Sequence, residues 1–289
     1  MYKLIASDVD GTIMPSNEVS TMRMKQAVNN VNKASTVLSL STGRRIASTE
    51  VVATTLGISK NPMICHCGAA ITLPSQKKIL RAVHIPANIA LKITEIALRS
   101  GSGISILENV HEGRHIFQLP YSHYFRTVAY NSWYGSFCRP CEISDLKSLS
   151  DPIQISLQGN SECVLEAYGN IQAIFQDALV YVDYGMLSSG DYVLDIFAAN
   201  VSKAQALLVL MDMYDVKSDE VAVFGDGKND LEILSIAGLP IAMENAPNFV
   251  KEKCARIAPK NNKDGVACVL EELYERNLLA PPDVLPSFA

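Results

Sequence analysis

The 289-residue sequence predicts an α/β fold in which a doubly wound parallel sheet is interrupted by an inserted α+β domain. Short apolar runs alternate with segments of helical periodicity over the first seventy residues, and this alternation returns after about residue 190. The stretch between them has shorter elements, most of the aromatic residues and four of the five histidines. We therefore expect a core built from residues 1–82 and 191–289, with residues 83–190 forming a cap.

In the first core segment, each predicted strand is short and rich in apolar or β-branched residues, as strands in buried sheets are. The first helix is indicated by Met24, Val28 and Val31, whose spacing places them on one helical face. Gly57 ends the second helix. In chain order we expect a strand at 3–7, a helix at 19–32, a strand at 36–40, a helix at 46–56, and strands at 62–66 and 70–73.

The elements of the cap and of the second core segment are predicted from the same apolar patterns and helix-capping residues. Ser202 is a good N-cap for the helix after it, and Gly101 follows the end of the first cap helix. In the cap we expect helices at 85–99 and 163–175 and strands at 104–107, 115–119, 153–157 and 179–184. In the second core segment we expect strands at 192–197, 220–224 and 239–243, helices at 203–213, 231–237, 247–254 and 265–275, and a tail at 281–289.

Composition narrows the possible functions. The net charge of −5 disfavours a nucleic-acid partner, which binds through cationic contacts to phosphates. No apolar run approaches the length needed to span a bilayer, and the short apolar stretch before Asp8 does not resemble a signal peptide. Seven cysteines without a secretory signal are typical of reduced thiols, so we expect a cytoplasmic protein. We expect a small-molecule substrate, no nucleic acid, no membrane, and a monomer or homodimer.

Two cysteine clusters could be functional sites and not ordinary thiols. Cys65-His66-Cys67 and the Cys138/Cys141 pair could together supply zinc ligands, or the second could be a redox pair. Their spacing matches no zinc module. We expect ordinary thiols, and the sequence leaves a metal or redox role open.

The first predicted strand ends in two carboxylates, Asp8 and Asp10, followed by Gly11 and Thr12. Residues two apart in an extended segment point the same way, so both carboxylates are expected to face one point. Adjacent carboxylates repel unless a cation or a shared proton holds them, and Mg²⁺ prefers oxygen ligands. A carboxylate can also act as a nucleophile and form an aspartyl-phosphate.

Other polar residues follow the predicted core strands. Thr42 and Gly43 end the second strand, Asp226 ends the strand at 220–224, and Lys203 begins a helix. In open parallel sheets, ligands bind beyond the carboxyl ends of the strands. The sequence therefore places these residues near Asp8, in a set suited to phosphoryl transfer, which depends on positioning and charge neutralisation.

These motifs resemble the haloacid dehalogenase superfamily, in particular its Cof-type (class IIB) phosphatases with a C2 cap. The resemblance covers nearly the whole core, with the motifs in order. It rests on the segments at 8–12, 41–44, 201–203 and 224–230, and on those at 242–247 and 262–267. Two departures are Cys67 in a turn that usually reads Asn-Gly-Ala, and Glu244 where glycine is common.

The resemblance implies a Mg²⁺-dependent phosphatase. Asp8 would be the nucleophile, and Asp10 the general acid and then the base that activates water. Thr42 and the backbone N–H groups of Val9 and Gly43 would hold the phosphoryl oxygens, Lys203 would neutralise charge, and Asn229 would contact phosphate. The metal ligands implied are Asp8, the backbone carbonyl of Asp10, Asp226 and, directly or through water, Asp230.

The cap is expected to set substrate specificity. The substrate expected first is a sugar phosphate, and the alternatives expected next are pyridoxal phosphate and flavin mononucleotide. Two other functions stay open: a phosphomannomutase-like phosphotransferase, and a sugar-phosphate-binding regulator without turnover. Polar and aromatic residues of the cap that could contact substrate are His111, Glu112, Arg114, His115, Tyr121, His123, Trp133 and Tyr134.

Overall fold

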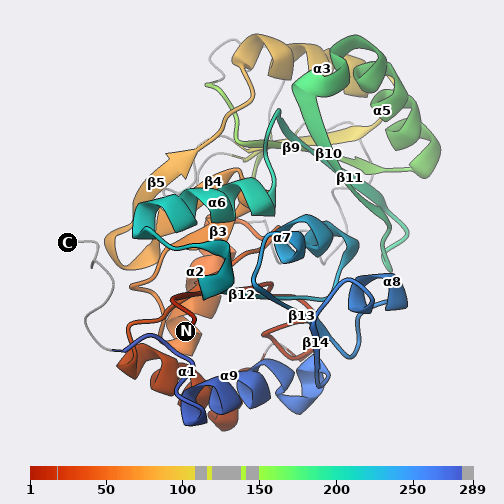
Figure 1. Cartoon of the computed structure of the whole chain (residues 1–289). Coiled ribbons are helices and arrows are strands. Elements are labelled where there is room, and N and C mark those ends of the chain that lie inside the picture. Colours follow the sequence, from red (N-terminus) through yellow and green to blue (C-terminus); the bar gives the residue numbers. More distant parts are fainter. Residues whose placement is uncertain (18, 108–115, 119–137, 141–149, 282–289) are drawn as a thin grey trace. The chain divides into compact units, whose positions relative to one another are not determined.

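The computed structural model describes residues 1–17, 19–107, 116–118, 138–140 and 150–281 of the chain (Figure 1). The chain divides into two compact units. The first combines Met1–Arg81 with Ser202–Ala289, and the second is Ala82–Val201. None of the described helices has both the length and the apolar character that crossing a bilayer requires.

The first unit is built on a five-stranded parallel sheet with the strand order β14-β13-β12-β1-β2. Its strands are β1 (Leu4–Ser7), β2 (Val37–Leu40), β12 (Val221–Gly225), β13 (Leu239–Met243) and β14 (Arg256–Ala258). The central strands β1 and β12 are buried along their full length, as expected of a parallel sheet covered on both faces. The predicted doubly wound parallel sheet is therefore confirmed.

Helices cover both faces of this sheet. Leu4 and Val223 belong to a buried cluster with Leu207 of α6 and Ile233 of α7, so one face packs against these two helices. Figure 1 shows α1 and α9 together on the other face. The helices of the unit are α1 (Met22–Lys33), α2 (Ile46–Leu56), α6 (Lys203–Tyr214), α7 (Leu231–Ser235), α8 (Asn248–Lys251) and α9 (Gly265–Glu275).

The start of α6 is held by two local features. The side chain of Ser202 caps the helix by accepting a hydrogen bond from the Gln205 N–H (3.1 Å). The preceding part of the chain contacts the turn at His66–Gly68, where Gly68 has φ +103° and a Cβ would lie 2.1 Å from the Ser202 carbonyl oxygen. Only glycine allows this close approach, which positions the first residue of α6, Lys203.

The turn at His66–Gly68 joins two strands of a small three-stranded sheet in the order β3-β4-β5. The strands are β3 (Met63–Cys65), β4 (Ala70–Leu73) and β5 (Lys78–Ala82), and the first two pair antiparallel. The backbone N–H of Cys67 donates to the Thr42 carbonyl (3.0 Å). This turn therefore contacts both the loop after β2 and the start of α6.

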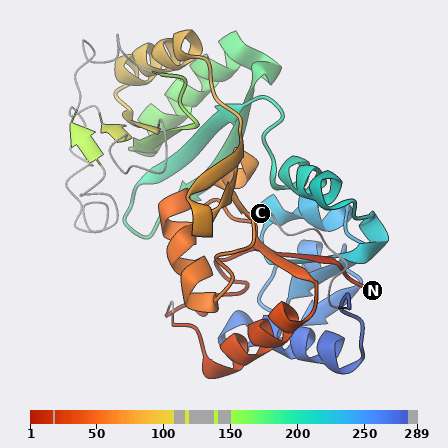
Figure 2. The same ribbon diagram turned by 90° about the vertical axis from the view of Figure 1, so that its left-hand side faces the viewer.

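The second unit contains a six-stranded sheet in the order β10-β11-β9-β6-β7-β8. Its described elements are α3 (Ala87–Arg99), β6 (Gly103–Leu107), β7 (Ile116–Gln118), β8 (Cys138–Pro140), β9 (Gln154–Gly159), α5 (Ser161–Phe175), β10 (Leu179–Met186) and β11 (Tyr192–Ala198). Neighbouring strands pair antiparallel except β7 and β8. Figure 2 shows α3 (gold) and α5 (green) lying side by side along the sheet, so this unit has the expected α+β organisation.

The central strands of this sheet alternate apolar and polar residues. Ile104, Leu157 and Leu194 are buried, and polar residues occupy the intervening positions. Ser156 lies opposite Ser105 on one neighbouring strand and Asp195 on the other. We call the residues on this second face the polar layer: Ser105, Gln154, Ser156, Gln158 and Asp195.

The boundary expected at residue 190 is wrong. Strand β11, expected in the core, pairs with β10 and β9 in the six-stranded sheet. The second unit therefore extends to Val201. A lone apolar strand carries no signal about which sheet it joins, because that choice depends on pairing partners distant in sequence.

Most other expected elements lie within a few residues of the observed ones. Among the described residues, three short strands lie outside the expected ranges: β5, β8 and β14. The helix expected at 247–254 is only the four-residue α8, and the tail at 282–289 lies outside the described residues.

Candidate active site

Two carboxylates meet at the carboxyl end of the core sheet. Asp8 follows β1 and Asp226 follows β12, and these strands are parallel neighbours with Ser7 opposite Phe224. The Asp8 N–H still donates to the Phe224 carbonyl (3.0 Å), which continues the ladder to the edge of the site. Strand pairing therefore brings together residues that are more than two hundred positions apart.

Lys203 joins Asp8 to a third carboxylate. Its Nζ lies 2.6 Å from Asp8 Oδ1 and 2.7 Å from Asp230 Oδ1, and the lysine side chain is only 2% exposed. Because all three side chains are buried, these charge-assisted hydrogen bonds are stronger than a surface ion pair. The arrangement fixes the orientation of the Asp8 carboxylate.

The electrostatics of this group are strongly coupled. Burial, with the negative charges of Asp230 and Asp226, raises the pKa of Asp8 to about 7, although the Lys203 ammonium opposes the shift. Burial lowers the pKa of Lys203, but the carboxylates of Asp8 and Asp230 outweigh it and the net shift is upward. Burial and the charge of Asp230 also raise the pKa of Asp226. Lys203 therefore stays protonated, and the carboxylates lack a full complement of positive charge.

This carboxylate group suits a hard divalent cation. One oxygen from each of Asp8, Asp226 and Asp230 lies within 4.8 Å of the others. All three donors are carboxylate oxygens, the ligand type that Mg²⁺ prefers. The donor set and its unbalanced negative charge therefore fit the metal expected from the sequence.

The two carboxylates from the loop after β12 are also held by neutral donors. Asp230 Oδ2 accepts hydrogen bonds from the N–H groups of Asp226 (3.1 Å) and Gly227 (2.9 Å). Asp226 accepts from the Thr12 hydroxyl (3.2 Å) and from the Asn245 side-chain amide (3.1 Å). These bonds fix both carboxylates without neutralising them.

Gly11 is required beside Asp226. It has φ +76°, and a Cβ at this position would lie 2.2 Å from Asp226 Oδ2. The glycine therefore lets the turn after β1 pass directly over the carboxylate.

Asp10 does not share the position of Asp8. Strand β1 ends at Ser7, so the two-residue alternation of an extended chain no longer applies at Asp10. The Asp10 carboxylate instead binds the guanidinium of Arg44 through two hydrogen bonds, Nε to Oδ2 (2.8 Å) and Nη2 to Oδ1 (2.5 Å). The expectation that both carboxylates face one point is therefore wrong for their side chains.

The other expected phosphate-binding residues lie in the same unit. Thr42 is buried after β2, and its hydroxyl accepts a hydrogen bond from the Arg44 N–H (3.1 Å). Val9 is buried beside Asp8, Gly43 is half-buried, and Asn229 is exposed on the short turn that contains Asp230. Their roles toward substrate remain predictions.

Sequence reasoning assigned no role to Asn245 or to the side chain of Arg44. Besides Asp226, the Asn245 amide binds the Gly11 carbonyl (2.8 Å), and its oxygen accepts from the Asn261 N–H (3.1 Å). It therefore ties together the loops after β1, β12 and β13. The available signal was its position two residues after β13, at the same sheet edge as Asp8 and Asp226.

The first cysteine cluster has the character of structural residues. Cys65, His66 and Cys67 are buried in and after β3. Burial raises the pKa of the Cys65 thiol to about 12, so it stays protonated and is a poor metal ligand. Cys141 and the eight cap residues expected near substrate lie outside the described residues.

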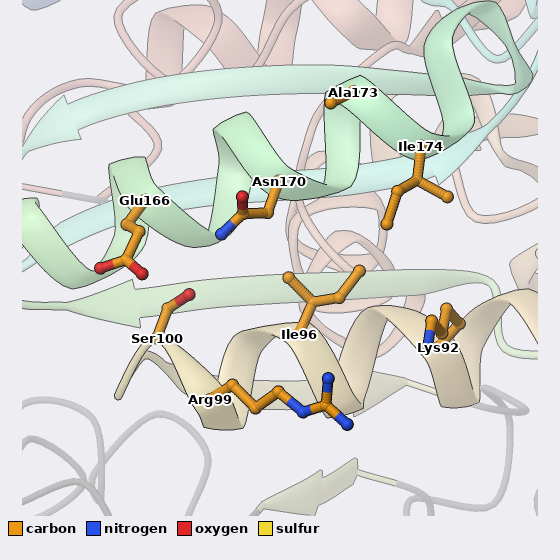
Figure 3. Close-up of a pocket in the computed structure, with 8 residues that line it drawn as sticks. All are labelled: Lys92, Ile96, Arg99, Ser100, Glu166, Asn170, Ala173 and Ile174. Atoms are coloured by element: carbon orange, nitrogen blue, oxygen red, sulfur yellow. The ribbon is translucent and has the colours of Figure 1, made fainter.

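A separate groove lies within the second unit, between α3 and α5 (Figure 3). Its volume is about 330 Å³. It is lined by Lys92, Ile96, Arg99 and Ser100 from α3 and its end, and by Glu166, Asn170, Ala173 and Ile174 from α5. None of these eight residues belongs to the carboxylate group.

Comparison with known proteins identifies related chains. The family model for haloacid dehalogenase-like hydrolases matches residues 5–270. A putative phosphatase from Haemophilus influenzae is 32% identical over 123 residues, which are 43% of this chain and 45% of that protein. The 5-amino-6-(5-phospho-D-ribitylamino)uracil phosphatase YitU from Bacillus subtilis is 23% identical over 94% of this chain and 97% of its own. The first alignment thus spans less than half of that relative.

Solved structures agree with the fold. A haloacid dehalogenase-like hydrolase from Bacteroides thetaiotaomicron superposes with a TM-score of 0.81 at 22% identity, covering 94% of this chain and all of the other. The subclass IIB sugar phosphatase BT4131 superposes with a TM-score of 0.72 at 16% identity, covering 94% and 98% of the two chains.

Proposed function

Because the chain belongs to the haloacid dehalogenase-like hydrolases, we propose that it is a Mg²⁺-dependent phosphatase that acts on a small phosphomonoester through an aspartyl-phosphate on Asp8. The observation that carries this proposal is the buried contact of Asp8 with Lys203, next to the carboxylates of Asp226 and Asp230. A buried, oriented carboxylate beside a cation is suited to attack a phosphoryl group, whose negative charge would otherwise repel it.

The first step transfers the phosphoryl group to the protein. An oxygen of Asp8 forms a bond to phosphorus while the bond from phosphorus to the substrate alcohol breaks. Asp10 donates its proton to the departing alcohol oxygen. This transfer matters because an alkoxide is a poor leaving group.

The second step regenerates Asp8. Asp10, now a carboxylate, takes a proton from a water molecule as the water oxygen attacks phosphorus. The bond between phosphorus and Asp8 breaks, inorganic phosphate leaves, and both aspartates return to their starting states. The same residue thus acts as acid and then as base.

The remaining residues of the site would bind the phosphoryl group or the metal and offset their charges. The Lys203 ammonium lies against Asp8 and would offset the charge of a phosphoryl group bound there. The Thr42 hydroxyl and the N–H groups of Val9 and Gly43 would bind phosphoryl oxygens, and Asn229 would contact them from the other loop. Asp8, Asp226, Asp230 and the Asp10 carbonyl would hold Mg²⁺, which when bound supplies positive charge to the transferred group.

For the substrate, we propose a phosphate ester of a sugar or related polyol. YitU is named for a ribityl phosphate and BT4131 as a sugar phosphatase, so both names describe a phosphate on a polyhydroxylated carbon chain. The second unit would select among such substrates. Fold alone does not determine the choice, since it is shared by enzymes with different substrates.

The test is phosphate release from a panel of sugar, polyol and cofactor phosphates with Mg²⁺ present. We expect turnover of one or more polyhydroxylated phosphates by the wild type and none by Asp8→Asn. Asp212→Asn, which changes an exposed carboxylate on α6, is the matched control and should keep full activity. Wild-type turnover that survives Asp8→Asn would rule out the mechanism.

Lack of turnover across the panel would favour the other two functions. A phosphotransferase would become active when a sugar bisphosphate is added. A regulator would bind a sugar phosphate without hydrolysing it.

A further inference from the structure

The ion pair between Arg44 and Asp10 differs from the other contacts of the candidate site. The Asp10 side chain is 62% exposed, while that of Arg44 is only 13% exposed. The guanidinium binds both carboxylate oxygens, so it defines the orientation of the carboxylate as well as its distance. An exposed aspartate without such a partner would turn freely between rotamers.

Arg44 is itself fixed from several directions. Its N–H donates to the Thr42 hydroxyl (3.1 Å), and its carbonyl accepts from the His66 N–H (2.9 Å). Its guanidinium also reaches the Ser48 hydroxyl on α2 (3.5 Å). Arg44 is thus anchored to the loop after β2, to the turn after β3 and to α2, and it can serve as the rigid partner of the pair.

The contact joins two loops with separate tasks in the proposed reaction. Asp10 follows β1 and exchanges protons with the leaving group and with water. Arg44 follows Thr42, which would bind the phosphoryl group. A fixed link between them would place the proton donor at a constant position relative to the bound phosphate, and misplacement of a reacting group by about 1 Å can cost about 10²-fold in rate.

We propose that Arg44 is a positioning residue that holds Asp10 in the orientation required for proton transfer. This inference rests on the proposed phosphatase function. Arginine keeps its protons in proteins, so Arg44 does not replace Asp10 as the acid. It acts through Asp10, which distinguishes it from Lys203 and Thr42.

The experiment compares kcat/KM for two substrate classes. An alkyl phosphate, such as a sugar phosphate that the enzyme turns over, needs its leaving oxygen protonated, whereas p-nitrophenyl phosphate releases a stable anion without help. We expect Arg44→Ala to lower kcat/KM for the alkyl phosphate by about 10- to 100-fold and for p-nitrophenyl phosphate by less than about 3-fold. An equal loss for both substrates, or no loss for either, would overturn the proposal.

A double-mutant cycle tests whether Arg44 acts through Asp10. If it does, Arg44→Ala should cost nothing further for the alkyl phosphate once Asp10→Asn is present. Additive losses would mean that Arg44 contributes independently, which contradicts the proposal. Arg44→Gln is the second variant, in case the alanine protein folds poorly.

The matched control is Arg23→Ala. Arg23 of α1 binds the Glu271 carboxylate of α9 with the same two-contact geometry, through Nε (3.0 Å) and Nη2 (2.5 Å). Its removal should leave both kcat/KM values unchanged. If the wild type hydrolyses neither substrate, or if Asp8→Asn keeps activity, the proposed function fails. If the wild type is active and Asp8→Asn is inactive, but Arg44→Ala affects the alkyl phosphate and p-nitrophenyl phosphate equally, the proposed function stands and only the role of Arg44 fails.

Discussion

The core and the second unit each bury carboxylates, but with different partners. At the candidate site, Asp8 and Asp230 share the ammonium of Lys203. In the polar layer, Asp195 accepts a hydrogen bond from the Ser156 hydroxyl (2.5 Å), which in turn accepts from the Gln154 amide (3.1 Å). In the core, the buried carboxylates are therefore stabilised by a positively charged ammonium. In the polar layer, the buried carboxylate is stabilised by neutral hydroxyl and amide groups.

The consequence of burial is visible in both places. It raises the pKa of Asp8 to about 7 despite Lys203, and that of Asp195 to about 6 despite the hydrogen bonds from Ser156 and Gln154. When all three carboxylates of the candidate site are ionised, they and the one ammonium leave two negative charges. A divalent cation would balance them. Both places bury carboxylates, so the excess negative charge is the feature that distinguishes the candidate metal site from the polar layer.

The largest expected effect comes from removing the cation of the core cluster. Lys203→Met keeps the length of the side chain but leaves Asp8 and Asp230 buried without their partner. Breaking a buried ion pair in this way should lower the free energy of unfolding by about 3–5 kcal/mol and abolish phosphatase activity. Urea unfolding and phosphate release measure the two effects. An unchanged unfolding free energy would show that the pair carries no stabilising interaction.

The next largest effect is expected from Asp195 in the polar layer, whose contribution to the free energy of unfolding should depend on pH. Because the pKa of Asp195 is raised from 3.8 to about 6 on folding, the folded state binds its proton more tightly than the unfolded state. The contribution of Asp195 to stability should therefore fall as pH rises from about 3 to about 7, by about 3 kcal/mol in total. The carboxylate is fully ionised above this window, and the penalty stays constant there.

Asp195→Asn isolates this contribution. The difference in unfolding free energy between the wild type and the variant should shift by about 2–2.5 kcal/mol between pH 4 and pH 7, with the variant favoured at the higher pH. Chemical unfolding at a series of pH values gives this difference. If this difference in unfolding free energy did not change with pH, the ionised Asp195 carboxylate would not be destabilised by burial, and the prediction would be wrong.

A smaller effect is expected when Mg²⁺ binds at the carboxylate group, where the excess negative charge lies. Mg²⁺ at about 100 times its dissociation constant should raise the unfolding free energy by about 2.7 kcal/mol, because the unfolded chain lacks the site. Asp226→Asn should remove this gain, since asparagine keeps an acceptor for Thr12 and Asn245 but loses the charge. Asp195→Asn is the matched control and should keep it. Equal responses in both variants would place the cation elsewhere.

The smallest effect is expected at an exposed ion pair. Arg23 and Glu271 join α1 to α9, with side chains that are 48% and 28% exposed. Removal of a surface pair typically costs about 0–1 kcal/mol, so Arg23→Ala should change the urea midpoint only slightly. A loss comparable to that of Lys203→Met would show that burial is not what separates the two pairs.

Local patterns in the sequence were enough to predict much of the fold. The helix Ile46–Leu56 and the helix Gly265–Glu275 have the expected bounds, because apolar periodicity and the flanking residues are local signals. The boundary of the second unit was not predictable in this way. Strand β11 has the same apolar character as a core strand, and only its pairing with β9 and β10 assigns it to the six-stranded sheet.

Sequence patterns alone were sufficient to predict which residues gather at the sheet edge. Asp8 and Asp226 follow apolar strands, and Lys203 begins a capped helix, so parallel pairing is sufficient to bring them together. The hydrogen-bond partners of these residues, by contrast, depend on how the loops fold against one another. Lys203 bridges Asp8 and Asp230, whereas Asp10 turns to Arg44, because the chain leaves the extended conformation after Ser7 and side-chain direction then depends on contacts between distant loops.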